Sequence, residues 1–360
     1  MAIATRKGFL THGALLALGS AALFGASTPF AKLLLGGGLS PWLLAGLLYL
    51  GSGIGLALAR AALRGRLTGA AHEAPLRRAD LPWLGLVILC GGALGPILLM
   101  AGLATTPASS AALLLNVEGL ATMAIAWVVF RESVDRRLMA GALAILAGAV
   151  VLSWRGGPAG FGLGSLAIVG ACLAWGVDNN LTRKLSSADP TQIAIAKGLV
   201  AGTVNVGLAL ATGATFPTWG PTLGAGLIGF LGYGVSLVLF VLALRRLGSA
   251  RTGAYFSTAP FIGALIAVGM FRDPVTVQLV AAGLLMAVGV YFHLSETHAH
   301  EHAHQDLEHE HRHVHDEHHR HAHGPDDPPG EPHNHPHRHR PLVHSHPHFP
   351  DLHHGHGHGR

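Results

Sequence analysis

The stretch from Ser109 to Phe130, SSAALLLNVEGLATMAIAWVVF, decides the fold. It has 22 residues, and Glu118 near its middle is its one ionisable side chain. At about 1.5 Å per residue, a helix of this length crosses the roughly 30 Å hydrocarbon core of a bilayer. A carboxylate at that depth costs roughly 2.5 to 3.5 kcal/mol on insertion scales. Glu118 is therefore expected to face protein or water, or to be protonated.

The composition indicates a membrane protein. Half of the 360 residues are apolar and 12% are charged, whereas about a quarter of a soluble protein is charged. Residues up to Leu294 carry a net charge of +11, and those from Ser295 onward carry −6 with neutral His. The basic residues lie in short loops and not on one polar face, so the expected partner is the lipid bilayer and not nucleic acid. Cys90 and Cys172 lie in apolar runs and are interpreted as small core residues.

Apolar runs of roughly 18 to 25 residues predict ten membrane-spanning helices. The runs lie near residues 9–35, 39–59, 81–104, 109–130, 138–154, 164–185, 191–211, 222–244, 252–271 and 275–294. If the N-terminus is cytoplasmic, the inner loops hold 15 basic residues and the outer loops hold Arg155 and Arg272 only. The positive-inside rule therefore places both termini in the cytoplasm, and the same bias supports the number ten.

The chain contains an internal repeat. At a constant offset of 141, Asn116 corresponds to Ser257, Gly119 to Pro260, and Phe130-Arg131-Glu132 to Phe271-Arg272-Asp273. LFGASTPFAK (23–32) also corresponds to AWGVDNNLTRK (174–184). Five spans repeated give halves of opposite topology, which is typical of secondary transporters with a site near the midplane. The predicted units are a first five-helix repeat at 1–154, an outer linker at 155–163, a second repeat at 164–294 and a tail at 295–360.

The tail after Leu294 differs in character from the rest. It holds most of the 26 histidines and almost no large apolar side chains. Such a segment cannot bury a core, so a disordered tail is expected. The predicted fold class is thus an all-α integral membrane protein of ten transmembrane helices in two inverted repeats, plus this tail.

The ten spans, the two halves, the Phe130-Arg131-Glu132 end of the fourth span and the Trp175-Gly176 region resemble the drug/metabolite transporter superfamily with its paired EamA-type domains. The resemblance covers about residues 10–294. It implies a bundle of ten helices that moves small solutes by alternating access, often as an exporter. One departure is that Gly119 follows Glu118 where members often have Glu-Pro, whereas Pro260 in the second half follows Ala259.

Glu118 is the first candidate for a substrate or proton pathway. On a continuous helix it would share a face with Leu114, Leu115, Thr122 and Ile125. The alternative is a protonated or hydrogen-bonded Glu that locks two helices. Asn116 points elsewhere round such a helix and is interpreted as an interhelical contact, with the pathway as the alternative.

Asp178 and Asn179 belong to three consecutive polar residues in the sixth span, of which at least one must face the bundle interior. Asp178 and Lys197 lie at matching depth on adjacent antiparallel spans. We therefore predict that Asp178 and Lys197 pair, either as a structural ion pair or as part of a gate.

Four further residues are weaker candidates for the pathway. Lys32 lies near the outer end of the first span, where it either reaches the interface or lines an outer cavity. Trp175, Tyr255 and Ser257 are candidate lining residues by their place in the repeat, with ordinary packing as the alternative.

The tail histidines recur with period two and form the predicted metal site. Neutral imidazole is the commonest ligand for Zn, Ni and Cu, so the tail is expected to bind Zn, Ni, Co or Cu ions labilely, and no cofactor is required. The alternative is a pH-sensitive appendage whose charge rises below about pH 6.5. The predicted ligands are His298, His300, His302, His304, His309, His311, His313, His315, His333, His335, His337 and His339.

These observations predict a transporter and not an enzyme, located in the cytoplasmic (inner) membrane. The leading function is secondary transport of a small solute, as export, coupled to protons or to the solute gradient. Direct use of ATP is not expected, since no Walker motif occurs. One alternative is efflux of divalent Ni, Co or Zn with the tail as collector or sensor. Another is a membrane-anchored metal buffer without transport. Whether two copies pair as a homodimer is left open.

Overall fold

The computed structural model describes most of the helical body and four short pieces of the tail. The described residues are 2–63, 76–130, 136–154, 161–182, 185, 189–247, 252, 255–294, 299–303, 307–313, 333–339 and 343–347. The predicted linker at 155–163 therefore lies mostly outside the described residues.

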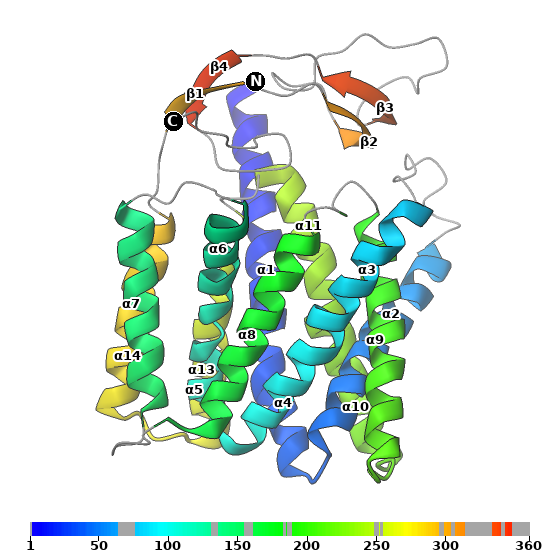
Figure 1. The fold of residues 1–360 in the computed structure, drawn as a ribbon, viewed down its shortest axis with the longest axis vertical. Coiled ribbons are helices and arrows are strands. Elements are labelled where there is room, and N and C mark those ends of the chain that lie inside the picture. The colour runs from blue at the N-terminus through cyan, green and yellow to red at the C-terminus, as the bar shows by residue number, and fades with distance from the viewer. Residues whose placement is uncertain are drawn as a thin grey trace.

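The body is a bundle of apolar helices (Figure 1). Its elements are α1 (Ala2–Gly36), α2 (Pro41–Leu63), the 3-10 turn η1 (Arg78–Asp80), α3 (Leu81–Val87), the π-helix η2 (Ile88–Leu94), α4 (Gly95–Thr105), α5 (Ala108–Leu114), α6 (Val117–Phe130), α7 (Arg136–Ser153), α8 (Leu163–Thr182), α9 (Pro190–Ala211), α10 (Trp219–Gly229), the π-helix η4 (Phe230–Val235), α11 (Ser236–Leu247), α13 (Ala259–Phe271) and α14 (Val277–Leu294).

Several of these elements are long and apolar enough to cross a membrane. Six helical stretches meet this criterion, namely Gly13–Gly36, Pro41–Ala62, Arg78–Thr105, Ala108–Val129, Thr191–Ala211 and Trp219–Phe240. The shorter apolar helices are Met139–Ser153, Ala259–Phe271 and Val277–Phe292. Each of the ten predicted runs coincides with helix in the described residues. This agreement confirms an all-helical membrane body, while the number of crossings stays a prediction.

The local sequence sets the helix ends. Asp189 caps α9, because its Oδ1 accepts hydrogen bonds from the backbone N–H groups of Thr191 (2.8 Å) and Gln192 (3.4 Å). Pro190 follows at the first position, where a missing N–H has no cost. Gly213 after the end of α9 has a φ of 86°, which only glycine adopts without strain.

Small residues let neighbouring helices approach closely. A Cβ placed on Gly53 of α2 would lie 2.6 Å from the backbone nitrogen of Leu199 in α9. A Cβ on Gly198 would lie 2.6 Å from the nitrogen of Gly53. The two backbones are therefore in direct contact. Such contact through small residues is typical of membrane helices, because lipid tails are as apolar as large side chains and leave no hydrophobic driving force between helices.

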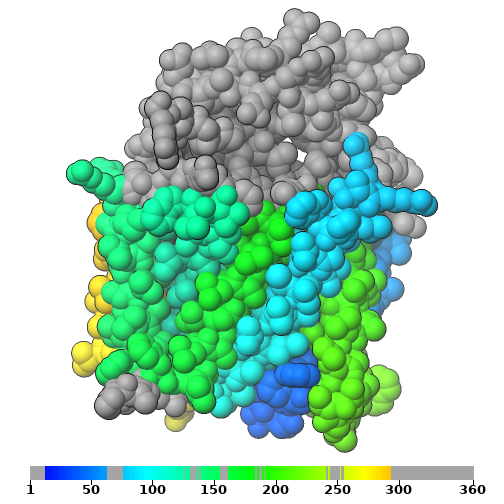
Figure 2. Space-filling view, viewed as in Figure 1, coloured from blue at the N-terminus to red at the C-terminus, as the bar shows by residue number. Residues whose placement is uncertain are grey.

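The helices pack in two lateral groups that α1 and α8 connect. α7 packs on α14 at one side of the bundle, and α2 packs on α9 and α10 at the other (Figure 1). α8 contacts both α4 and α6, and α1 contacts α11 and α13. Figure 2 shows one broad face of the bundle, made of α7, α8, the α3 to α4 segment and α9. α8 and α1 thus link the groups.

The fourth and ninth predicted spans are not continuous helices. In the fourth, α5 ends at Leu114, Leu115 and Asn116 form a turn, and α6 starts at Val117. Leu114 therefore ends one helix, and Glu118 lies in the first turn of the next. In the ninth, a turn at residues 257–258 precedes α13. A polar side chain of each turn adds a second hydrogen bond to a backbone carbonyl, since Asn116 Nδ2 donates to the carbonyl of Leu113 and Thr258 Oγ1 to that of Tyr255.

The third and eighth predicted spans each contain a π-helical stretch. Their π-helices, η2 and η4, begin at Ile88 and Phe230, which are 142 positions apart and so match the repeat offset of 141 to within one residue. Such π stretches are rare and occur frequently at functional sites. Apolarity and length carry no signal for them, and so the sequence predicted plain spans.

The structure describes four short segments of the tail, all of them strands. These are β1 (Ala299–Ala303), β2 (Leu307–His313), β3 (His333–His339) and β4 (Val343–Pro347), which pair antiparallel as β1 with β4 and β2 with β3. They lie beyond the end of the bundle where α1 begins (Figure 1). The alternation of His with other residues has the period of a strand, although an isolated two-stranded ladder is marginally stable in water.

Candidate functional site

The π-helix η2 is the point on which three other helices converge. The carbonyl oxygen of Gly91 accepts hydrogen bonds from Tyr49 Oη of α2 (2.7 Å) and from Trp175 Nε1 of α8 (2.9 Å). The carbonyl of Gly92 accepts from Asn205 Nδ2 of α9 (2.9 Å). These donors satisfy backbone oxygens in a segment whose regular i to i−4 bonding is interrupted. Trp175, predicted as a lining residue with ordinary packing as the alternative, is 5% exposed, and its hydrogen bond holds η2 against α8.

An ion pair lies beside the same turn. Lys197 Nζ of α9 donates to Asp178 Oδ2 of α8, and the side chains are 18% and 5% exposed. Thr182 Oγ1 donates to the other carboxylate oxygen at 3.3 Å. This contact confirms the predicted pairing of Asp178 with Lys197. A Cβ on Gly91 would overlap the Asp178 carboxylate, so a glycine is needed at this position.

Glu118 lies in the first turn of α6, directly after the break in the fourth span. Its Oε1 accepts a hydrogen bond from Asn179 Nδ2 of α8 at 3.0 Å. The same amide donates to Thr122 Oγ1 at 3.1 Å, and Thr122 Oγ1 donates to the carbonyl of Glu118 at 2.9 Å. Asn180 Nδ2 also donates to the carbonyl of Thr122 at 3.0 Å. Hydrogen bonds between side chains and backbone therefore join α6 to α8.

The two carboxylates of this region differ in their partners. Asp178 is neutralised by Lys197, whereas Glu118 has only neutral hydrogen-bond partners among the residues that the structure describes. Glu118 is half-buried, and Asn179 and Gly119 beside it are exposed. The region thus contains one ion pair and one carboxylate without a counter-charge.

Five aromatic rings from both halves of the chain lie in contact with one another. Ring centroids are 5.5 Å apart for Tyr49 and Tyr233, 5.9 Å for Tyr233 and Phe24, 5.4 Å for Phe24 and Phe256, and 4.9 Å for Phe256 and Phe240. We refer to these five residues as the aromatic cluster.

Lys32 is not part of this arrangement. Its Nζ donates to the carbonyls of Leu103 (2.5 Å) and Ala104 (3.0 Å) at the C-terminal end of α4. A cation at a helix C-terminus is favoured by the helix dipole, which explains the contact without a cavity. Nearby, Asp273 Oδ2 accepts from the backbone N–H (3.1 Å) and Oγ (2.7 Å) of Ser109 at the start of α5.

The remaining predicted pathway residues lie at the breaks. Asn116 is 7% exposed and lies 3.8 Å from Met286 Sδ of α14, so it contacts another helix as expected. Tyr255 is 37% exposed and Ser257 lies in the turn before α13. The structure therefore groups Glu118, Asp178, Asn179, Lys197 and Trp175 round α8, with Lys32 apart from them.

Sequence reasoning missed three contributors: Tyr49, Asn205 and Tyr233. Asn205 was detectable, because a fully buried amide inside an apolar span needs a partner. Tyr49 was detectable only as an aromatic in a span, and its acceptor is 42 positions away in the chain.

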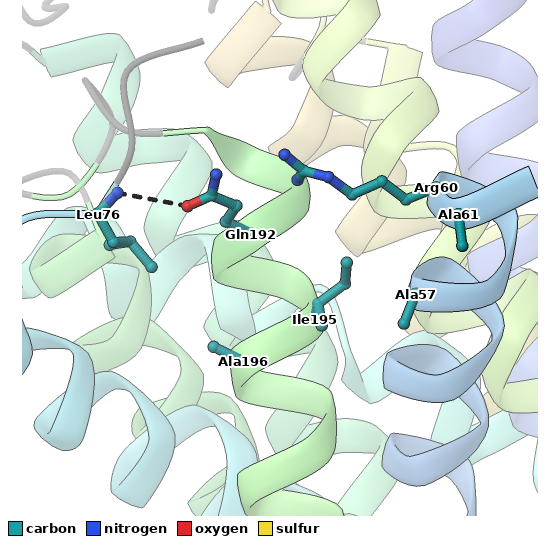
Figure 3. A pocket seen from close by; sticks show the side chains of 7 residues that line it. All are labelled: Ala57, Arg60, Ala61, Leu76, Gln192, Ile195 and Ala196. Atoms are coloured by element: carbon teal, nitrogen blue, oxygen red, sulfur yellow. Dashed lines mark hydrogen bonds between the residues drawn. The ribbon is translucent and has the colours of Figure 1, made fainter. Parts of the chain in front are cut away.

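A pocket of about 550 Å³ lies between α2 and α9 (Figure 3). It is lined by Ala57, Arg60, Ala61, Leu76, Gln192, Ile195 and Ala196. Arg60 Nη1 is 2.8 Å from Asp189 Oδ2, so its charge is already matched. None of the predicted pathway residues lines this pocket, whose polar lining side chains are Arg60 and Gln192.

The tail strands place histidines opposite one another. The register pairs His300 with His346, His302 with His344, His309 with His337, His311 with His335 and His313 with His333. Of the twelve predicted metal ligands, His298, His304 and His315 lie outside the described residues. The structure describes the backbone of the other nine.

Comparison with known proteins places this geometry in context. The pattern of the EamA-like transporter family matches residues 11–154 and again residues 162–295. A relative from Methanothermobacter thermautotrophicus, described as an uncharacterized transporter, is 29% identical over 226 residues. That match covers 61% of this chain and 66% of the relative, just under two thirds of its length. A solved crystal structure, described only as that of a protein, has a TM-score of 0.58 at 20% identity over 79% of this chain and 98% of that chain, which shows the fold alone.

Proposed function

The chain belongs to the EamA-like transporter family, and from that membership we propose that it is a secondary transporter that exports a small solute across the cytoplasmic membrane by alternating access. The two halves, 1–154 and 164–294, act as inverted repeats that rock against each other, with 155–163 as the outer linker. The separate matches of the family pattern to 11–154 and 162–295 support this division.

The observation that carries the proposal is the half-buried carboxylate of Glu118, which has no basic partner in the described chain and lies at a break in its span. Discontinuous helices at the midplane form the binding sites of many secondary transporters. A carboxylate inside the membrane has a high free-energy cost. Where no basic side chain compensates its charge, a bound solute or a proton is the simplest source of the missing positive charge. In this proposal Glu118 binds the solute or the coupling proton, and Asn179 orients its carboxylate.

The remaining residues support Glu118. The Asp178 and Lys197 pair and Trp175 fix η2 against α8, which holds the π-helix next to the solute path. Asn116 and the turn containing Ser257, with Tyr255 before it, act as pivots in the two halves. Lys32 ties α1 to the outer end of α4. The excess of basic residues in alternate loops supports cytoplasmic termini.

An expression host tests the proposal directly. We expect cells that make the wild-type chain to lower the internal level of the exported solute and raise its level in the medium, measured by mass spectrometry of both pools. Glu118→Gln, which keeps the shape and removes the charge, should abolish the difference. The matched control is Asp80→Asn in η1. Equal solute pools with wild type and Glu118→Gln, at equal protein levels in the membrane, would contradict the proposal.

A second candidate function is the handling of divalent Ni, Co or Zn, for which the register of the tail strands is the specific support. Five His positions face five others across the two ladders. Directly opposite positions of a ladder are neighbours, and neutral imidazole is a common ligand for these ions. The tail would collect or sense cytosolic ion for efflux, or would buffer it without transport.

Metal tolerance of cells separates these possibilities. Efflux predicts that Glu118→Gln abolishes resistance to Ni or Zn even with the tail intact. Buffering predicts that only deletion of 295–360 matters. If neither change alters metal tolerance, the metal functions fail and the organic solute remains.

A further inference from the structure

We propose that the pocket between α2 and α9 binds an anionic phospholipid, whose phosphate contacts Arg60 and Gln192 and whose acyl chain lies on the apolar walls. This is a second site, apart from Glu118, and it does not depend on which solute the protein carries. Four features of the pocket support it: its level along the spans, its walls, the exposed apolar surface beside it and the charge at its rim.

The pocket lies at the level where two membrane spans end. Arg60 is two residues from the end of the span Pro41–Ala62, and Gln192 is the second residue of the span Thr191–Ala211. The positive-inside rule predicts that these span ends are cytoplasmic. Basic pockets between transmembrane helices on that side bind anionic lipid headgroups. The volume of about 550 Å³ is within the roughly 300 to 1,000 Å³ of ligand pockets.

The pocket has a polar rim and apolar walls. Figure 3 shows Arg60 reaching from α2 toward Gln192 of α9, with Ala57 and Ile195 below them. The other lining residues are Ala61, Leu76 and Ala196. A phospholipid has the same division, because its phosphate needs hydrogen-bond donors and its acyl chain needs apolar surface.

The walls continue into exposed apolar surface. On α2, Ala61 is exposed and shares a helix face with the exposed side chains of Leu58 and Ile54. On α9, Ala196 lies one turn from the exposed Val200. Exposed apolar side chains of membrane spans face lipid. The surface on α2 extends about 9 Å from the rim along the helix axis, which is within half of the roughly 30 Å hydrocarbon core.

The rim offers hydrogen-bond donors to a phosphate. Asp189 balances the charge of Arg60, but it contacts Nη1 alone, and a guanidinium has five N–H donors. Gln192 Oε1 accepts a hydrogen bond from the backbone N–H of Leu76 at 3.4 Å, so the amide nitrogen of Gln192 still has its own donors. A phosphate can therefore accept from both side chains while the ion pair stays in place.

The charge round the rim favours an anion. Arg77 and Arg78 directly follow the lining residue Leu76, and both are exposed. Residues 60–78 contain five arginines and a single acidic residue, Glu73. Basic segments beside membrane spans attract anionic headgroups, so the surplus of positive charge adds to the contact with Arg60.

Two other ligands fit the pocket less well. The ammonium group of a zwitterionic lipid needs a carboxylate, and none occurs among the seven lining residues. The nearby acids are engaged, since Asp189 pairs with Arg60 and caps α9, and Asp80 Oδ2 accepts from the backbone N–H of Arg77 at 2.8 Å. Free inorganic phosphate gains nothing from the apolar walls.

Native mass spectrometry of the purified full-length protein in detergent tests the proposal, because it counts bound lipids and measures the dissociation constant of the first one. The probes are phosphatidylglycerol and phosphatidylcholine with identical acyl chains, with inorganic phosphate as the soluble anion. We expect phosphatidylglycerol to bind about fivefold more tightly than phosphatidylcholine, the factor that one arginine near an anionic headgroup supplies. Arg60→Gln should remove this preference, and Arg60→Lys should retain part of it.

A second variant leaves the ion pair with Asp189 in place. Ala57→Phe fills the pocket from α2, so the tightly bound phosphatidylglycerol should be lost although every charge remains. The matched controls lie on α7, where Ala147 and Arg136 are both exposed. Ala147→Phe and Arg136→Gln should keep the preference of the wild type. If Arg60→Gln does not fold, Ala57→Phe decides the question.

Equal affinity for the two lipids would overturn the proposal, and so would an undiminished preference in Ala57→Phe. Displacement of phosphatidylglycerol by an equal concentration of inorganic phosphate would show a phosphate site in place of a lipid site. The transport function is tested separately, because Glu118 does not line this pocket. Export that needs Glu118 stands or falls without changing the lipid result.

Discussion

Replacement of Lys197 by Met should destabilise the bundle, because it leaves the Asp178 carboxylate buried without its counter-charge. The Asp178 side chain is 5% exposed and is packed against the backbone of Gly91, so water cannot replace the ammonium. Removing one partner of a buried ion pair costs about 3 to 5 kcal/mol. Lys197→Met keeps the aliphatic stem, so loss of packing adds little.

The opposite change, Asp178→Asn, should cost less. The Lys197 side chain is 18% exposed and its flexible stem can carry the ammonium toward water, so we expect a loss of about 1 to 3 kcal/mol. The double variant should lose less than the sum of the two single losses by about 0.5 to 3 kcal/mol. A charge swap is unsuitable, because the Asp178 carboxylate packs so closely against Gly91 that even a Cβ on that glycine would overlap it. The longer Lys side chain would not fit in the same space.

The free energy of unfolding is measured by titrating the purified protein in mixed micelles with SDS and following helix content by circular dichroism. The matched control is Arg60→Met, which breaks the more exposed pair with Asp189 (33% exposed at Arg60). If Lys197→Met changes the free energy of unfolding by less than 1 kcal/mol, or if the double variant equals the sum of the singles, the pair is not a coupled buried contact.

Three further changes have expected outcomes. Gly91→Ala should lower the free energy of unfolding by about 1 to 3 kcal/mol, because the added Cβ overlaps the Asp178 carboxylate, and an unchanged SDS midpoint would contradict this. Lys32→Met should lower it by about 0.5 to 2 kcal/mol through loss of the contact with the end of α4, whereas Lys32→Arg should retain most of it. Asn205→Leu should destabilise by about 1 to 3 kcal/mol, because the Gly92 carbonyl loses its donor inside the bundle, and a more stable variant would show that the carbonyl is satisfied otherwise.

The membrane body and one of its contacts follow from the sequence. The apolar runs predicted where helices lie, since burial in lipid leaves no choice other than a helix for a single span. The pairing of Asp178 with Lys197 followed from depth alone, because adjacent antiparallel spans bring equal depths together. The place of Glu118 near polar residues of the sixth span was also within reach, although its partner Asn179 became clear only from the structure.

The interruptions of the spans do not follow from the sequence. A π-helix at Ile88–Leu94 and a turn at Leu115–Asn116 have the same hydropathy as a plain helix, so periodicity cannot reveal them. Carbonyls of the π-helix are satisfied by side chains distant in the chain, namely those of Tyr49 and Asn205. The strands of the tail show a related difficulty, because alternating His predicts composition and period but no pairing partner.

The central claim is that solute leaves the cell through a path in which Glu118 supplies the necessary charge. The most direct measurement is efflux from proteoliposomes that contain purified protein and are loaded with the solutes identified in the cell comparison. The account predicts efflux with wild type, reduced but measurable efflux with Glu118→Asp, and no efflux above empty liposomes with Glu118→Gln. Efflux by Glu118→Gln at the rate of wild type would contradict it.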